Sequence, residues 1–194
     1  MPADLEVTFD YLCPFARNAH EALVTYVRDG GGRPIRFRPF SLNQVHIPEG
    51  EPPVWERSPD TWGSGVTGLL YGIAVRDNFP DSFLDFHVGA FALRHDEGGK
   101  LKDAELKAVA DKVGIDSELL SKEVWSGRPL ATLEQEHREL VSRWNVFGVP
   151  TFIQGEQAVF IRFMERNNVE DLRRAIDLLE WTRLNEFKHT SIAR

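Results

Sequence analysis

The chain has 194 residues, with 23 Lys or Arg against 30 Asp or Glu, so its formal net charge at pH 7 is −7. A hydrophobic content of 42%, with 13 Phe and 5 Trp, supplies enough apolar side chains for a packed core and excludes an intrinsically disordered chain. An acidic chain without a cluster of Lys and Arg lacks the charge pattern of proteins that bind phosphate backbones, so no nucleic acid is expected as a partner.

The sequence shows no segment that would direct it into or across a membrane. No stretch approaches the roughly 20 apolar residues of a membrane-spanning helix. Residues 1–10 lack the basic start and the apolar core of a secretory signal. Cys13 is the only cysteine, so no disulfide can form within the chain. These features predict a cytoplasmic protein that has no membrane partner.

The N-terminal part of the chain predicts a strand, a helix and a second strand. Apolar and polar residues alternate over residues 5–9, as in a strand with one buried face. A helix is predicted to begin at Pro14, because proline suits the first helical position, and to end at the glycines 30–32. Alternation returns over residues 35–39. A βαβ unit of this kind almost always has a right-handed crossover.

The middle of the chain is predicted to be helical. Residues 41–65 are rich in Pro, Gly and Ser and predict a loop. Apolar residues then recur at helical spacing as far as Trp144. Helices are expected around residues 83–93, 106–113, 117–124 and 133–144.

Strand patterns return near the C-terminal end. Residues 151–153 and 158–161 flank a short turn and predict a hairpin. Asn168 is the expected N-cap of a last amphipathic helix with acidic residues in its first turn. The fold class is therefore α/β, with one domain at residues 1–60 and 145–194 and a helical insertion at 61–144.

Cys13 is the candidate nucleophile. As the residue before Pro14, it is predicted to be the N-cap of the first helix, where unpaired N–H groups and the helix dipole favour a thiolate. Its pKa is therefore expected below the free-cysteine value of about 8.5. The alternative is an inert packing residue. Asp10 is either a proton shuttle for the sulfur or an Asx-turn residue, and a charged Asp10 would raise the thiol pKa.

Three motifs in this order resemble the DsbA-like branch of the thioredoxin superfamily. They are residues 10–16 (DYLCPFA), 38–43 (RPFSLN) and 147–152 (FGVPTF). That branch includes FrnE-type oxidoreductases and is related to kappa-class glutathione transferases and 2-hydroxychromene-2-carboxylate isomerases. The resemblance implies a thioredoxin-like fold, βαβ followed by ββα, with a large α-helical insertion.

The resemblance also implies roles for individual residues. Cys13 matches the nucleophile, and Pro150 matches a cis-proline that faces it. In the family, the backbone before that proline pairs with a bound peptide or glutathione. The alternative for Pro150 is a trans proline that begins a strand. Catalytic roles are thus expected for Cys13 and Asp10, and substrate or thiol binding for Pro14, Phe15, Val149, Pro150 and Thr151.

The chain departs from the family pattern at Ala16, where a dithiol oxidoreductase has its second cysteine. No internal thiol can then release a mixed disulfide from Cys13. The expected function is monothiol exchange of a small thiol, disulfide or peptide substrate. No tightly bound cofactor is expected, and glutathione or another low-molecular-weight thiol is the external reactant. The alternatives are a glutathione-dependent transferase or isomerase, and a non-catalytic peptide- or thiol-binding module.

Other candidate sites are weaker. The six histidines show no metal-ligand spacing, and no metal is expected. His87 either lines the active-site groove or is a satisfied core residue. The six histidines are His20, His46, His87, His95, His137 and His189.

An apolar face of the helical insertion is a candidate homodimer surface, unless it is buried within the chain. This face comprises Trp62, Leu69, Leu70 and Tyr71.

Overall fold

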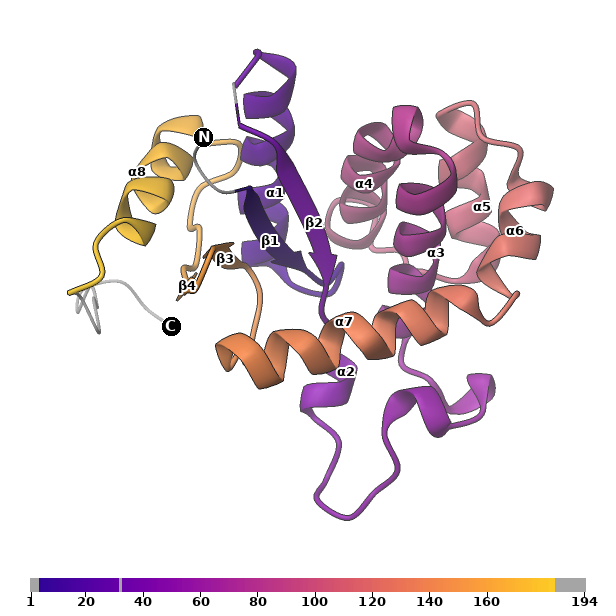
Figure 1. Cartoon of the computed structure of the whole chain (residues 1–194). Helices are drawn as coiled ribbons and strands as arrows, with labels where there is room; N and C mark the ends of the chain where they lie inside the picture. The colour runs from indigo at the N-terminus through magenta and orange to yellow at the C-terminus, as the bar shows by residue number, and fades with distance from the viewer. Residues whose placement is uncertain (1–3, 32, 184–194) are drawn as a thin grey trace.

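The computed structural model describes residues 4–31 and 33–183. His189 and the other remaining residues lie outside the described part of the chain. A four-stranded sheet with α1 and α8 lies at one end of the molecule, and a block of helices lies at the other (Figure 1). In chain order the elements are β1 (Leu5–Phe9), α1 (Pro14–Arg28), β2 (Ile35–Pro39), α2 (Leu42–Val45), α3 (Ser64–Asn78), α4 (Pro80–His95), α5 (Asp103–Lys112), α6 (Ser117–Val124), α7 (Arg128–Trp144), β3 (Thr151–Gln154), β4 (Gln157–Phe160) and α8 (Val169–Leu179).

The sheet has the strand order β2-β1-β3-β4. β1 pairs with β2 in parallel, as a βαβ unit requires, and Val7 lies opposite Phe37. β3 runs antiparallel to β1 and to β4, so the predicted hairpin forms the second half of the sheet. The predicted α/β class is confirmed, and β1 is a central strand whose carboxyl end leads directly into Cys13.

The two faces of β1 and β2 contact different helices because side chains alternate along a strand. On one face, the Phe9 ring packs against His20 of α1 and His87 of α4. On the other face, Arg38 is buried and reaches Glu136 of α7, with 2.5 Å between its Nε and Oε2. Glu6 and Glu139 also bind this guanidinium, which compensates for burying its charge.

The segment predicted as a loop is partly ordered into short helices. Ser41 caps α2, and its Oγ accepts a hydrogen bond from the Gln44 N–H at 3.2 Å. Two short 3-10 helices follow at Val54–Glu56 and Pro59–Thr61. One or two turns produce too little hydrophobic periodicity to be read against a background rich in Pro and Gly.

The helical block comprises α3 to α7, which lie between β2 and β3 in the chain. Leu69, Leu70 and Tyr71 of α3 are at most 1% exposed, so this part of the candidate face is buried within the chain, as the alternative interpretation expected, whereas Trp62 is half-buried. A homodimer stays a prediction. α3 is central in the block and packs against its neighbours all round. Within the described residues, no helix combines the length and hydropathy needed for a membrane span. The division into two domains stays a prediction.

A chain of buried polar groups joins α1, α4 and the residues after β1. His20 Nε2 lies 3.1 Å from the Thr8 carbonyl oxygen, His87 Nε2 lies 2.9 Å from His20 Nδ1, and the Tyr11 hydroxyl lies 2.9 Å from His87 Nδ1. A carbonyl only accepts, so His20 must carry its proton on Nε2. His87 then donates from Nε2, and Tyr11 donates to His87. His87 is therefore the core residue that one of the two sequence interpretations expected.

Burial keeps both histidines neutral. It lowers the pKa of His20 to about 4 and lowers the pKa of His87 well below its usual value. With two neutral rings, each histidine donates one hydrogen bond and accepts another within this chain. Tyr11, two residues before Cys13, is thereby tied to α4.

This assignment predicts the effect of Tyr11→Phe. Without the hydroxyl, His87 Nδ1 is left buried without a donor, so the free energy of unfolding is expected to fall by about 1–3 kcal/mol. Urea unfolding followed by circular dichroism measures this change. Tyr26→Phe on α1 is the matched control, since the Tyr26 hydroxyl makes no hydrogen bond within the described residues. Equal losses in the two variants would contradict the proposed hydrogen-bond chain.

Candidate active site at Cys13

Cys13 is the N-cap of α1. Its backbone N–H donates to the Asp10 carbonyl at 3.1 Å, which closes the turn between β1 and α1. Pro14 occupies the first helical position, where its missing N–H has no cost. Cys13 Sγ accepts a hydrogen bond from the Ala16 N–H at 3.4 Å. The predicted position of the sulfur at the start of α1 is therefore observed.

A second segment lies against the sulfur from the other side. The Val149–Pro150 peptide bond is cis. Cys13 Sγ lies 3.3 Å from the Val149 carbonyl oxygen and donates its proton to it. Thr151 anchors this segment, because its N–H donates to Thr8 Oγ1 and its own hydroxyl donates to the Gly148 carbonyl, both at 2.8 Å. We call residues 148–151 the proline loop.

The remaining predicted binding residues border the same place. Pro14 is exposed and Phe15 is half-buried. Phe15 extends toward the segment after β4, where the Arg162 guanidinium carbon lies 5.3 Å from the centre of its ring. That segment is joined to the proline loop, since the Ile161 N–H donates to the Pro150 carbonyl at 3.3 Å. The structure therefore brings together Cys13, Pro14, Phe15, Val149, Pro150 and Thr151.

Asp10 lies behind the sulfur, inside the protein. Its side chain is fully buried, and its two carboxylate oxygens accept hydrogen bonds from the N–H groups of Leu12 at 2.9 Å and Leu42 at 2.8 Å. These bonds favour the Asx-turn interpretation over the proton shuttle. Burial raises the pKa of Asp10 to about 6, although both hydrogen bonds act in the opposite direction.

The expected low pKa of Cys13 is wrong. Burial of the thiol, which is 8% exposed, raises its pKa above the ordinary value for cysteine. The N–H groups of Ala16 and Phe15 favour the thiolate, as expected for a helix N-terminus, but they do not outweigh desolvation. Asp10 raises the pKa further, and Arg162 lowers it. The sequence identified the helix end correctly but could not show how deeply the sulfur is buried.

Three residues of the site were not identified from the sequence. Tyr11 and His95 hold the turn before Cys13, with 2.9 Å between His95 Nε2 and the Tyr11 carbonyl oxygen. His87 and His95 lie two helical turns apart on α4, a spacing that could have indicated a shared face. Arg162 had no such signal, because its position depends on how the segment after β4 lies against α1.

Metal binding receives no support within residues 4–31 and 33–183, where no group of three His, Cys, Asp or Glu could hold an ion. His20 and His87 are used in the core, as described above. The groups described at the site are one sulfur, two backbone segments and one nearby cation.

Two comparisons of the sequence with known proteins find similarity over part of the chain. The model of the DSBA-like thioredoxin domain family matches residues 85–177. Over 154 residues the chain is 29% identical to uncharacterized protein Rv2286c of Mycobacterium tuberculosis. That alignment covers 78% of this chain and 64% of the mycobacterial protein, so the chain spans about two thirds of its relative's length.

Solved structures show the same fold at low sequence identity. A DsbA variant from Pseudomonas aeruginosa has a TM-score of 0.62 at 20% identity and covers 94% of this chain and 89% of its own. BdbD from Bacillus subtilis has a TM-score of 0.64 at 17% identity, with coverages of 92% and 87%. A thioredoxin-like oxidoreductase from Silicibacter pomeroyi has a TM-score of 0.61 at 19% identity, with coverages of 93% and 87%. The chain has the DsbA-like thioredoxin fold with a helical insertion, which is the fold that the resemblance implied.

The electrostatics of the site predict the pH dependence of alkylation. Only the thiolate reacts with iodoacetamide, so the alkylation rate is expected to rise with pH. The midpoint of that rise is expected above the pKa of free cysteine, about 8.5. Above pH 6 Asp10 is ionised and opposes a second negative charge. Asp10→Asn is therefore expected to move the midpoint to lower pH.

The matched control is Asp111→Asn, which removes an exposed carboxylate on α5. It should leave the alkylation midpoint unchanged. Circular dichroism establishes that each variant is folded. A wild-type midpoint below the free-cysteine value would contradict the dominance of burial.

Proposed function

We propose that this protein is a thiol–disulfide oxidoreductase that works through Cys13 alone, with a low-molecular-weight thiol as its second substrate. One observation carries the proposal: Cys13 Sγ lies between the first turn of α1 and the Val149 carbonyl of the proline loop. Ala16, whose N–H contacts the sulfur, stands where a second cysteine would resolve the intermediate. Among the described residues no other thiol is present to do so.

The proposed reaction has two balanced steps. Cys13 first loses its proton to a solvent base, and the thiolate attacks a disulfide RS–SR. The S–S bond of the substrate breaks, a bond between Cys13 and one sulfur forms, and RS⁻ leaves. In the second step an external thiolate attacks the mixed disulfide, forms a new disulfide with the substrate sulfur, and returns Cys13 as a thiolate. The external thiol is consumed as a reactant.

The proline loop supports binding of the substrate. The Val149 carbonyl already meets the sulfur, and the Val149 N–H makes no hydrogen bond within the described residues. An extended backbone next to the attacked sulfur, as in a peptide or glutathione, can pair with both groups like an added strand. This pairing would bring the substrate disulfide to Cys13. A reducing compartment such as the cytoplasm would supply the external thiol.

A second candidate function has an observation in its favour. Burial and Asp10 keep the Cys13 thiol protonated at neutral pH, which opposes nucleophilic attack. A non-catalytic module that binds a thiol or peptide along the proline loop would need no thiolate. The glutathione-dependent transferase or isomerase stays a prediction of the family resemblance.

The proposal predicts a long-lived adduct on Cys13. Wild-type protein exposed to glutathione disulfide is expected to gain the mass of one glutathionyl group per chain, because no second thiol expels it. Intact-mass spectrometry measures this gain. Added dithiothreitol is expected to restore the original mass. Cys13→Ser is expected to form no adduct.

Ala16→Cys tests the reason for that persistence. A sulfur at position 16 lies one helical turn from Cys13, so it is expected to expel glutathione and leave an internal disulfide. The variant should then show no lasting adduct and should lose two hydrogens in mass. If wild-type protein forms no adduct with small disulfides, the oxidoreductase proposal fails and the binding-module candidate replaces it.

A further inference from the structure

Arg162 is a cation at the active site with no assigned role. Its side chain is exposed and lies over two aromatic rings. The guanidinium carbon is 5.3 Å from the centre of the Phe15 ring and 5.8 Å from that of Phe160. Arg162 makes no ion pair with any residue in the described part of the chain. This charge thus lies over two ring faces, and no carboxylate of the described residues neutralises it.

The two rings belong to the two walls of the site. Phe15 lies in the first turn of α1, two residues after Cys13. Phe160 ends β4 and covers the proline loop so closely that a Cβ on Gly148 would lie 3.1 Å from its ring. The Ile161 N–H, one residue before Arg162, donates to the Pro150 carbonyl at 3.3 Å. Arg162 therefore lies where α1 and the proline loop meet.

The electrostatic surroundings of the sulfur agree with this position. The Arg162 charge is close enough to lower the pKa of the Cys13 thiol, while Asp10 raises it. Asp10 is fully buried and already accepts two backbone hydrogen bonds, so it is not a partner for Arg162. Arg162 is thus an exposed positive charge near the candidate nucleophile, in a chain whose formal net charge is −7.

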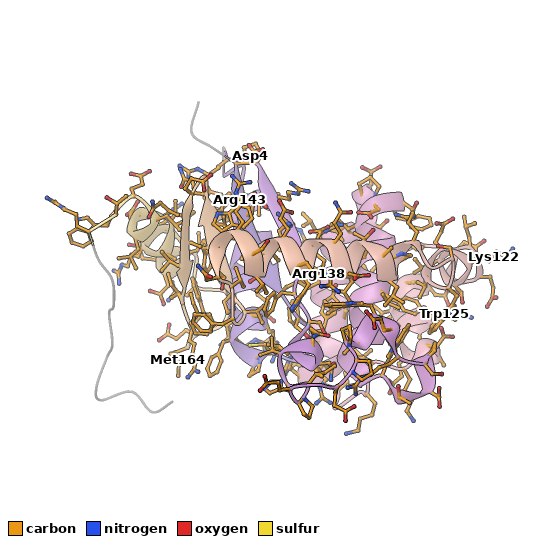
Figure 2. The ribbon with its side chains drawn as sticks, turned by 60° about the horizontal axis from the view of Figure 1, so that its bottom comes forward. Asp4, Lys122, Trp125, Arg138, Arg143 and Met164 are labelled. Atoms are coloured by element: carbon orange, nitrogen blue, oxygen red, sulfur yellow. The ribbon has the colours of Figure 1, made fainter. Side chains whose placement is uncertain are left out.

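The Arg162 guanidinium lies over two rings, and its N–H groups make no hydrogen bond within the described residues. A guanidinium held over ring faces can present the N–H donors of its planar edge to a ligand. Such an edge matches a carboxylate, which it binds through two parallel hydrogen bonds. Among residues 4–31 and 33–183, binding one here displaces no ion pair of Arg162. Two exposed apolar side chains belong to nearby parts of the chain. Phe147, 65% exposed, packs against the Phe160 ring. Met164, two residues after Arg162, is 50% exposed and projects outward at the sheet end of the molecule (Figure 2).

We propose that Arg162 is a specificity-determining residue that binds a carboxylate of the disulfide attacked by Cys13. The substrate class is then small disulfides whose thiol half carries a carboxylate, as glutathione does, in preference to neutral or cationic disulfides. This inference rests on the proposed function, because it requires that Cys13 form mixed disulfides.

The test compares three disulfides of different charge. Rate constants for adduct formation are measured by intact mass with glutathione disulfide, with neutral 2-hydroxyethyl disulfide and with cationic cystamine. Arg162→Gln removes the charge and is expected to slow the reaction with glutathione disulfide about tenfold relative to the neutral disulfide, since hydrogen bonds to charged groups are strong. The ratio between the two rates cancels any change in the thiol pKa. The relative rate with cystamine is expected to rise.

Two further variants make the result specific. Arg162→Lys keeps the charge but not the flat, two-pronged edge, and is expected to retain part of the preference. Arg166→Gln is the matched control, because Arg166 is already paired with Glu21 and Asp96. It should leave the ratio of rates unchanged. Added salt should lower the preference of the wild-type protein.

The outcomes separate this inference from the proposed function. If wild-type protein reacts with all three disulfides and Arg162→Gln leaves their relative rates unchanged, the role of Arg162 is wrong while monothiol chemistry stands. If wild-type protein reacts with none of them, the proposed function fails and the inference fails with it. A loss of preference in Arg162→Gln but not in Arg166→Gln supports the inference.

Discussion

The position of the sulfur depends on one turn, Asp10 to Cys13, which is held by partners from distant parts of the chain. Asp10 accepts two backbone hydrogen bonds, one from the Leu12 N–H inside the turn and one from the Leu42 N–H after β2. Tyr11 is bound through its carbonyl by His95. Cys13 itself meets Val149, 136 positions along the chain. Because these bonds are buried or partly buried, breaking one of them leaves a shielded polar group without its partner, which favours this conformation of the turn.

The burial of this turn also disfavours the thiolate form of Cys13, which nucleophilic attack requires. The helix N-terminus favours a thiolate at Cys13, and desolvation disfavours it more strongly. Arg162 is the nearby group whose charge acts in favour of the thiolate, while Asp10 acts against it. In the proposed reaction, an anionic substrate bound at Arg162 would meet Cys13 as a protonated thiol. Cys13 must therefore lose its proton before it attacks the bound substrate.

The inserted helices contribute residues that hold the turn before Cys13. α4 supplies His87 and His95, which hold the side chain and the carbonyl of Tyr11. The family match at residues 85–177 begins within α4 and includes the proline loop, but it does not include Cys13. The geometry of the structure is therefore what joins the matched part of the chain to the candidate nucleophile.

Local sequence patterns determined the strands, the main helices and the helix start at Pro14, because period, capping and proline chemistry act over a few neighbouring residues. They also placed Cys13 at a helix N-terminus and excluded a dithiol through Ala16. The raised pKa of the thiol, the use of Asp10 in a turn and the place of Arg162 were decided by tertiary structure. Each depends on burial and on partners far along the chain, because desolvation and long-range contacts arise only when separate elements pack together.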